Sequence, residues 1–492
     1  MLTVSPNCLK GYELFHNGIS ALTDIEENGI RIDTNYVAKE KKRLTKQIGK
    51  IEKKFLKLPE VKKWRKRYGK EFNHGSDQQL GDMLYNVLGY STEIRTATGN
   101  PSTSQEALEQ LGSPMVESIL QMRRYTKCRD TYLNNYELEQ IDGFMHPFFH
   151  LHIPVSFRSS SSRINFQNQP SRLAEMVKIV RSGIIPRKGH VIVGWDYSGV
   201  EVSVAACYHK DPAMIQQIED PSKDMHRDMA AMCYMLPTEE FMDGSKRAAS
   251  IRHCGKNMFV FPQFYGDYYG NNAKDMWNAI DVVKLQTSAG RGLKAHLRRK
   301  GIKNLNYFTE HLKQVEAYFW GEKFPVYGKW KKSHYKKYCK NGYVDLLSGF
   351  RCSGYMGKND AINYPIQGAA FHCLLWSLIH LNEWMKKNCK YSKLIGQIHD
   401  EIVGDIHKDE FNMVMKKAVE IMQEKINKFY DWLIVDLQVE ADCTTLNGSW
   451  YTKNEIHKKD CGCGCEWMYK HKTETAVIWQ CPFCSEKIEE KI

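Results

Sequence analysis

The sequence predicts an α+β protein in which a strand-bearing centre is split along the chain by a helical segment. Three observations predict it. Residues 9–140 read as a series of helices, runs of β-branched and apolar residues at 190–195 and 394–406 read as strands, and residues 211–340 between them return to helical patterning. The two strand regions can share one antiparallel sheet only if the chain returns after the helical segment, and we expect that it does.

The N-terminal segment is expected to be mainly helical and strongly basic. Residues 39–70 contain fifteen Lys or Arg against three Glu, within a chain of net charge +13. A block of one charge sign indicates a polyanion partner, most simply nucleic acid. A charged helix along a phosphate backbone is favoured over a partly disordered basic arm, because apolar residues recur in the block at nearly helical spacing. These residues are Leu44, Ile48, Ile51, Phe55 and Leu58.

The later elements follow from local patterns. Residues 146–210 are expected to contain short strands, and NGYVDLLSGFR at 341–351 predicts a hairpin. Apolar positions between 370 and 381 predict a helix with one buried face, and residues 410–430 predict another. Between them, KLIGQIHDEIVGDI predicts a second hairpin with His399, Asp400 and Glu401 at or near its tip.

Length and composition exclude a membrane protein. The 492 residues are 42% apolar and 26% charged, as in soluble globular proteins, and the length suggests about three compact units. No run approaches the roughly 18 apolar residues of a membrane helix, and the first residues lack the layout of a signal peptide. We therefore expect a cytoplasmic protein with no membrane partner.

Two acidic signatures are the most informative feature, Asp196 in VIVGWDYSGVEVSVA and Asp400-Glu401 in LIGQIHDEIVGDI. Each carboxylate closes a run that reads as a buried strand, where it is costly unless a positive group satisfies it. Two of them brought together would repel unless divalent cations lie between, which is the arrangement that two-metal phosphoryl transfer needs. The alternative is that each aspartate only ends a strand in a turn.

The C-terminal tail has the cysteine pattern of a zinc ribbon. A C-x-x-C knuckle at Cys481 and Cys484 follows a cysteine cluster by about fifteen residues, and four thiolates suffice for one tetrahedral Zn²⁺. Cys463 and Cys465 are the expected first pair, with Cys461 as the alternative member. The apolar run AVIW between the knuckles predicts a small hairpin. An unstructured thiol-rich tail is the competing interpretation, and a disulfide framework is disfavoured without a secretory signal.

A set of short motifs occurs in a fixed order between about residue 20 and residue 451. They are EENGIRID, TGNPST, NFQNQP, GWDYSGVEVSVA, RHCGKNMFVFPQFYG, INYPIQGAA, QIHDE and NGSW. Together they resemble the polymerase region of family A DNA polymerases, meaning bacterial DNA polymerase I and its phage relatives. The motifs around Asp196, Arg252 and Asp400 are similar to the family's first, second and third motifs.

The resemblance implies a right-hand polymerase of the α+β class. Its palm would be an antiparallel sheet plus helices, and its fingers and thumb would be helical. The expected divisions are a thumb-like helical basic region at 1–145, the first part of the palm at 146–215, fingers at 216–340, the second part of the palm at 341–453, and a Cys-rich zinc-ribbon-like tail at 454–492.

The same resemblance assigns the catalytic residues. Asp196 and Asp400 would hold two Mg²⁺ ions, Glu401 would assist nearby, and the backbone carbonyl of Tyr197 would add an oxygen ligand. One ion would lower the pKa of the primer 3′-hydroxyl and the other would neutralise the departing pyrophosphate.

The nucleotide-binding residues are expected around the second motif. Arg252 and Lys256 lie four residues apart and suit a triphosphate, although a solvated helix face is the plain alternative. Glu201 matches the glutamate that, with a neighbouring tyrosine, excludes a ribose 2′-hydroxyl. The spacing from Lys256 to Phe261 is one residue longer than usual, and Pro262 should kink the helix. Either Phe261 and Tyr265 or Val260 and Phe264 could therefore occupy the expected positions, and the first pair is preferred.

The resemblance places primer-template contacts at six residues. Arg, Asn and Gln can reach minor-groove acceptors that all correct base pairs share, although turn structure is a plain alternative for Asn165 and Asn363. Three positions depart from the family pattern, with Gly199, Ser203 and Asn359 replacing polar or basic residues. The six contact residues are Arg158, Asn165, Gln167, Asn363, Gln367 and His399.

The expected function is a template-directed DNA polymerase that adds dNTPs to a primer 3′-hydroxyl and lacks its own 3′–5′ exonuclease domain. The partners are primer-template DNA and dNTPs, with a separate exonuclease, clamp or helicase as further candidates, in the host cytoplasm if a phage encodes the protein. The alternatives are a single-subunit RNA polymerase-like enzyme and a catalytically silent DNA-binding replication protein. Replication, repair and lesion bypass all fit the sequence.

Overall fold

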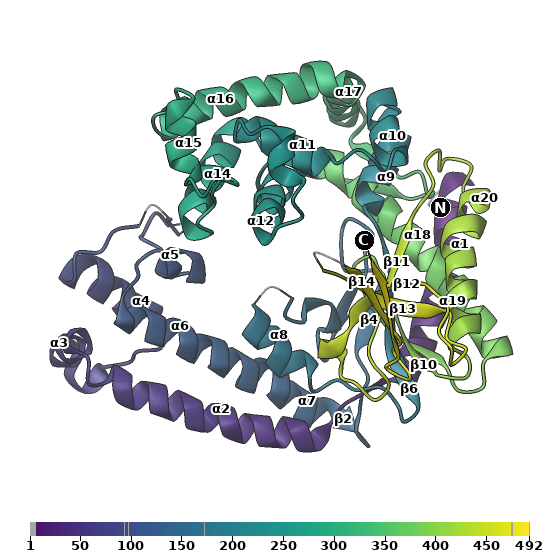
Figure 1. Ribbon diagram of the computed structural model, residues 1–492, viewed down its shortest axis with the longest axis horizontal. Helices are drawn as coiled ribbons and strands as arrows, with labels where there is room; N and C mark the ends of the chain where they lie inside the picture. The colour runs from purple at the N-terminus through teal and green to yellow at the C-terminus, as the bar shows by residue number, and fades with distance from the viewer. Residues whose placement is uncertain (1–5, 93, 97, 172, 474–475, 492) are drawn as a thin grey trace.

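An eight-stranded antiparallel sheet forms the centre of the molecule, in the order β15-β14-β13-β12-β11-β6-β10-β9 (Figure 1). The computed structural model describes residues 6–92, 94–96, 98–171, 173–473 and 476–491. Both predicted strand regions lie in this one sheet, so the expected return of the chain is confirmed. The strands are β6 (His190–Tyr197), β9 (Lys393–Ile398), β10 (Glu401–His407), β11 (Val439–Cys443), β12 (Asn454–Lys458), β13 (Trp467–Lys472), β14 (Ala476–Gln480) and β15 (Lys487–Lys491).

Helices pack on strands β9 and β10, which are largely buried together with β6. The 31-residue α18 (Lys358–Asn388) has buried residues along most of its length and packs against α1 (Pro6–Asn28). The helix predicted at 410–430 is present as α19 (Phe411–Val419), the π-helix η8 (Glu420–Lys425) and α20 (Ile426–Phe429). α9 (Val200–His209) follows β6 directly and packs against α18.

The N-terminal unit is helical, as predicted, and has a separate hydrophobic core around Phe55, Trp64 and Leu84. Asp33 caps α2 by accepting a hydrogen bond from the Tyr36 amide, at 2.9 Å. The elements are α2 (Thr34–Phe55), α3 (Pro59–Tyr68), η1 (Gly69–Glu71), α4 (Asp77–Gly81), η2 (Asp82–Val87), α5 (Gln105–Glu109), α6 (Pro114–Thr126), η3 (Lys127–Leu133) and α7 (Asn134–Glu139).

The segment from α10 to α17 forms the helical group at the top of Figure 1. Within it, the π-helix η6 (Lys256–Val260) directly precedes α13 (Phe261–Tyr265). A π-turn takes up one extra residue without breaking a helix, which is how the long spacing before Phe261 is accommodated. The other elements are α10 (Pro212–Glu219), α11 (Met225–Cys233), η5 (Thr238–Phe241), α12 (Lys246–Gly255), α14 (Tyr269–Val282), α15 (Leu293–Arg299), α16 (Leu305–Tyr318), η7 (Phe319–Lys323) and α17 (Pro325–Asn341).

Short elements connect these units, and the hairpin expected at 341–351 forms between β7 and β8. Strand β1 precedes α2 and pairs with β3, whereas β2, β3, β4 and β5 follow α7 and precede β6 along the chain. The bounds are β1 (Ile30–Arg31), β2 (Gln140–Ile141), β3 (Phe144–Met145), β4 (Phe148–His150), β5 (Ser160–Ser162), η4 (Phe166–Asn168), α8 (Ala174–Arg181), β7 (Tyr343–Asp345), β8 (Arg351–Ser353) and η9 (Trp450–Thr452).

The C-terminal tail is joined to the central sheet. β12 pairs with β11 on one side and with β13 on the other, and the AVIW run forms β14 in a hairpin with β13, as predicted. The tail also docks on α19, where the Asn412 side chain donates to the Gly464 carbonyl at 2.7 Å and Phe411 packs edge-on against Phe483. The sequence suggested a separate ribbon, but the structure continues the sheet through it.

Among the residues that the structure describes, no helix combines the length and apolarity that crossing a membrane would require.

Candidate active site

The two acidic signatures meet at the neighbouring ends of strands β6 and β10, inside the central sheet. β6 and β10 pair in a register that sets Asp196 opposite Glu401, and β11 sets Glu440 opposite Asp196 on the other side. Asp400 lies in the turn before β10, and its carbonyl accepts a hydrogen bond from the Tyr197 amide at 3.3 Å. Carboxylates about two hundred residues apart in the chain therefore occupy one small region.

The electrostatics of this cluster favour a bound cation. Burial, followed by the charges of Asp400 and Glu401, raises the pKa of Asp196 to about 8. Burial also raises the pKa of Asp400. Among the described residues, Asp196 Oδ1 is buried with no hydrogen-bond partner. A buried carboxylate oxygen without a donor, beside further carboxylates, is a donor set that fits a hard divalent cation.

A buried lysine, which sequence reasoning missed, lies behind the cluster. Lys453 contacts Glu401 and lies 2.7 Å from Asp442, with 7% of its side chain exposed. Gly194 leaves the space for this group, because a Cβ there would overlap Glu401 Oε1 and lie 2.5 Å from Lys453 Nζ. No sequence pattern around Lys453 identifies it as a buried partner of carboxylates, because Glu401 and Asp442 come from two distant strands.

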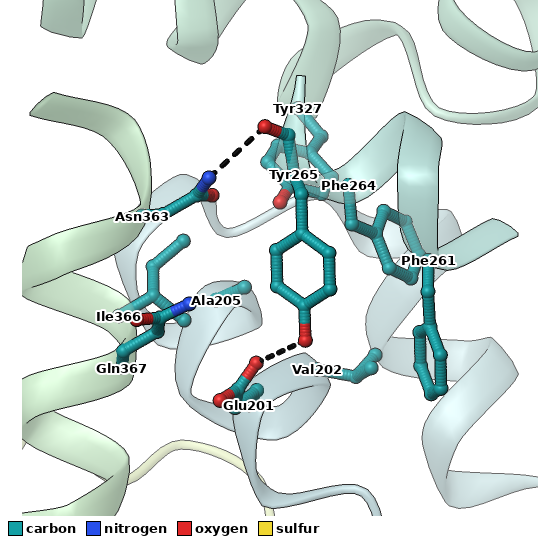
Figure 2. A pocket seen from close by; sticks show the side chains of 10 residues that line it. All are labelled: Glu201, Val202, Ala205, Phe261, Phe264, Tyr265, Tyr327, Asn363, Ile366 and Gln367. Atoms are coloured by element: carbon teal, nitrogen blue, oxygen red, sulfur yellow. Dashed lines mark hydrogen bonds between the residues drawn. The ribbon is translucent and has the colours of Figure 1, made fainter. Parts of the chain in front are cut away.

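A second group of residues lies beside the carboxylates and lines a small hollow (Figure 2). The Tyr265 hydroxyl donates to Glu201 Oε2 at 2.6 Å, and Arg158 donates to the other oxygen of Glu201. The Asn363 side chain donates to the Tyr265 carbonyl at 3.0 Å. Gln367 also lines this hollow. The structure thus brings together predicted residues from four separate segments of the chain.

The structure places Phe261 and Tyr265, the preferred pair, on the accessible side of the second motif. Val260 and Phe264 are buried, and Phe264 packs against Phe319 at 5.9 Å between ring centroids. Tyr265 is 40% exposed. The π-turn before Phe261 explains this register, since it restores the helical face that an added residue would otherwise rotate away.

Arg252 and Lys256, the two side chains predicted to bind the triphosphate, lie near one another in the helical group. Only Arg252 forms an ion pair with a carboxylate of the described residues. Arg252 donates to Asp224 at 2.6 Å, an ion pair that the sequence did not indicate. Lys256 Nζ lies 5.2 Å from the centre of the Phe261 ring. Partial burial, and then the charges of Arg252 and Lys256, lower the pKa of His226 to about 4, so both cations lie near this side chain.

The remaining predicted contact residues fall into two classes. Gln167 and His399 line a polar hollow, which also includes Arg123, Arg124 and Lys127. His399 has a positive φ of 54°, and the Gln167 side chain donates to Gln397 at 2.6 Å. The Asn165 side chain, in contrast, accepts from the Asn168 amide and caps η4, which is the turn role named as its alternative.

The cysteine cluster brings four thiols together. The ligand sulfurs of Cys461, Cys463, Cys481 and Cys484 all lie within 4.8 Å of one another. Sulfurs bound to one tetrahedral zinc at about 2.3 Å would lie about 3.8 Å apart, so this group fits the metal. The Cys465 thiol is not a member of this group, although it lies beside Cys481, and it donates to the Trp467 carbonyl at 3.0 Å. The geometry thus corrects the expected first pair, replacing Cys465 by the alternative Cys461.

Comparison with known proteins agrees with this geometry. A family model described as DNA polymerase family A matches residues 34–451. The chain belongs to DNA polymerase family A.

Three relatives illustrate how far the family likeness extends. The chain is 26% identical to a DNA polymerase of Bacillus phage SP01 over 85% of this chain and 48% of the relative. It is 26% identical to DNA polymerase I of Pseudomonas aeruginosa over 80% of this chain and 39% of the relative. For the thermostable DNA polymerase I of Thermus aquaticus the identity is 25%, over 82% and 44%. The chain therefore spans about half or less of the length of these family A relatives.

A solved structure shows the same fold. It is the polymerase domain of Pol1 from M. smegmatis, in complex with DNA primer-template and dNTP. The TM-score is 0.68 at 21% identity, covering 88% of this chain and 70% of that chain. The family A chain thus has the α+β fold of a right-hand polymerase, with antiparallel sheet and helices as predicted.

The raised pKa of Asp196 makes the stability of the metal-free protein depend on pH. The pKa is about 8 in the folded chain against an ordinary value of 3.8, so between these values folding takes up a proton. This contribution is complete below about pH 4 and is lost as pH rises toward 8. In EDTA, we expect the thermal midpoint to fall between about pH 5 and pH 8. Asp196→Asn should flatten this dependence and added Mg²⁺ should offset it, whereas an unchanged slope in Asp196→Asn would refute the assignment.

Proposed function

We propose that this protein is a template-directed DNA polymerase that adds dNTPs to a primer 3′-hydroxyl. The observation that carries the proposal is the position of Asp196, Asp400 and Glu401 beside the Glu201–Tyr265 pair. Carboxylates suited to metal-assisted phosphoryl transfer thus lie next to a hydrogen-bonded pair of side chains that could contact the sugar of a nucleotide. The family membership and the relatives named DNA polymerase support the same function.

The proposed division of the chain follows the sequence boundaries. Residues 1–145 would form the thumb, 146–215 and 341–453 the palm, and 216–340 the fingers. The sheet that carries the carboxylates supports the palm assignment, and the two helical groups on either side of it support the other two. The tail at 454–492 would be an addition to the palm rather than an independent body, since β12 pairs directly with β11.

The metal chemistry would depend on Asp196 and Asp400, with the Tyr197 carbonyl as a further oxygen donor. Two Mg²⁺ ions held there would lower the pKa of the primer hydroxyl and neutralise charge on the departing pyrophosphate. The Tyr197 side chain is not free for this chemistry, because its hydroxyl bonds the Met422 carbonyl at 2.9 Å in the core. That anchor fixes the backbone of residue 197 beside Asp196.

The remaining residues would bind and orient the reactants. Arg252 and Lys256 would bind the triphosphate, Arg252 after exchanging its ion pair with Asp224 for phosphate. Phe261 and Tyr265 would pack against the incoming base and sugar. Lys453 would keep Glu401 in place by holding its carboxylate from behind. The proposed primer-template contacts are Arg158, Asn165, Gln167, Asn363, Gln367 and His399.

Substitution of Asp400 tests the proposed activity. Asp400→Asn keeps the side-chain shape but removes one metal-binding charge, so primer extension should fall by at least about 10³-fold. Binding to a primed oligonucleotide should stay within about threefold, since no DNA contact is lost. The control is Asp409→Asn, at an exposed aspartate beyond the other end of β10. Normal Mg²⁺-dependent extension by Asp400→Asn would overturn the proposal, and inactive wild-type protein would favour a silent DNA-binding role.

The Glu201–Tyr265 pair predicts selection of deoxynucleotides. Glu201→Ala removes the carboxylate that Tyr265 and Arg158 bind. In the proposal, this carboxylate lies where the 2′-hydroxyl of an incoming ribonucleotide would be. We expect the preference for dNTPs over rNTPs to fall by about 10- to 200-fold in a competition assay. Glu322→Ala, at an exposed glutamate of η7, should leave the preference unchanged. Equal use of both nucleotides by the wild type would instead indicate an RNA polymerase-like enzyme.

We further propose that Cys461, Cys463, Cys481 and Cys484 bind one structural Zn²⁺. The close approach of their thiols supports it, and so does the small size of the tail, which has little core of its own.

Metal analysis should find about one zinc per chain. Cys461→Ser should lower the zinc content sharply, because one of four thiolates is lost, whereas the matched Cys465→Ser should retain zinc. Chelation of zinc should also lower the thermal midpoint. If Cys465→Ser loses zinc and Cys461→Ser retains it, Cys465 is the ligand instead. Absence of zinc from carefully prepared wild-type protein would refute the site.

A further inference from the structure

A straight row of lysines runs along one face of α2. Lys39, Lys42, Lys46, Lys50 and Lys53 follow one another at intervals of three or four residues, so they project from the same side of the helix. At about 1.5 Å per residue the row is about 21 Å long, with roughly one positive charge for each helical turn. We refer to these five residues as the lysine row.

The lysine row lies opposite the face by which α2 joins the molecule. Val37, Leu44 and Phe55 are buried on that inner face, which packs against α6. With 100° between successive residues, the inner face and the row are separated by roughly half a turn of the helix. All five lysines are exposed, and among the residues that the structure describes none of them forms an ion pair. A solvated helix face usually mixes charge signs, so this face stands out.

The lysine row is separated from the polar hollow around Gln167 and His399, which we take as part of the cleft that would hold the primer-template. The polar hollow that contains Gln167 and His399 is lined from the N-terminal unit by Arg123, Arg124 and Lys127 of α6 and η3. Helix α6 therefore stands between the lysine row and that hollow. Figure 1 shows the same arrangement, with α2 along the bottom and α6 between it and the helical group at the top. A duplex in the cleft would meet α6, not the outer face of α2.

We propose that the lysine row is a second nucleic-acid-binding surface, which holds the phosphate backbone of DNA beyond the stretch that lies in the cleft. Unpaired lysines in a line match a regular polyanion, and they attract it without reading its sequence. The exposed cations Lys62, Lys63 and Lys66 of α3 continue the positive surface beyond the end of α2. The inference depends on the proposed function only in that the cleft is taken to hold nucleic acid.

The test compares DNA of two lengths with a triple variant, Lys42→Gln/Lys46→Gln/Lys50→Gln. The short probe is a primer-template with about 10 base pairs of duplex, and the long probe carries about 40 base pairs upstream of the same primer end. The variant should extend and bind the short probe as the wild type does. Its affinity for the long probe should fall by about tenfold or more, and the slope of log K against log salt should decrease by about 2.7, since each lysine contributes about 0.9.

The matched control is Lys387→Gln/Lys390→Gln/Lys408→Gln, three exposed lysines outside α2 and α3, near the end of α18 and after β10. This variant carries the same change in net charge and should not differ from the wild type on either probe. Circular dichroism and the thermal midpoint of both variants check that the substitutions do not unfold the protein.

Three outcomes of the binding comparison would overturn the inference. Equal loss on both probes would place the row in the cleft, and no loss on either would make it an ordinary solvated face. Unchanged binding of the long probe, together with lysine-dependent binding of a polyglutamate peptide, would identify an acidic protein segment as the ligand instead. Wild-type protein that fails to extend the short probe would refute the polymerase proposal, and the binding comparison would still decide the role of the row.

Discussion

The confinement of several carboxylates at one end of a sheet is the constraint on which the rest of the structure depends. The register of β6 with β10 and β11 sets Asp196 between Glu401 and Glu440, with Asp400 in the adjoining turn. Neighbouring carboxylates that are buried together repel one another and lose hydration, which is unfavourable unless cations compensate their charge. The protein supplies one of these cations itself, Lys453, and the unpartnered oxygen of Asp196 indicates where another positive group belongs.

A polar network links this sheet to the helical group that interrupts it. Glu201 stands at the start of α9, directly after the strand that carries Asp196, and it accepts hydrogen bonds from both Tyr265 and Arg158. Asn363 of α18 holds the backbone of Tyr265 from the other side. A helix that ends in these contacts cannot move without changing the surroundings of the carboxylates, so nucleotide binding and metal binding would be coupled through few residues.

Sequence reasoning predicted the features that a local pattern specifies. The split sheet, the hairpin at Asp400 and the helical N-terminal unit follow from periodicity, and the motif order indicated the family. Sequence reasoning preferred Cys465 to Cys461, but the two have similar spacing to the second knuckle, and only the fold of the turn between them decides which thiol joins the group of four. It also missed Lys453 and the ion pair of Arg252 with Asp224, since such contacts join residues far apart in the chain. The π-turn before Phe261 shows how the fold absorbs an added residue that the sequence could register only as a misfit.

The strand order also determines which backbone the protein leaves open to other molecules. Because the tail continues the sheet, its last strand, β15, forms the outer margin in place of β11. That strand carries Lys487, Glu489, Glu490 and Lys491, all exposed, and charged side chains discourage another chain from adding to a sheet. The exposed charges of β15 therefore oppose self-association through the unpaired amides and carbonyls at this margin of the sheet, whatever the chemistry of the tail's cysteines.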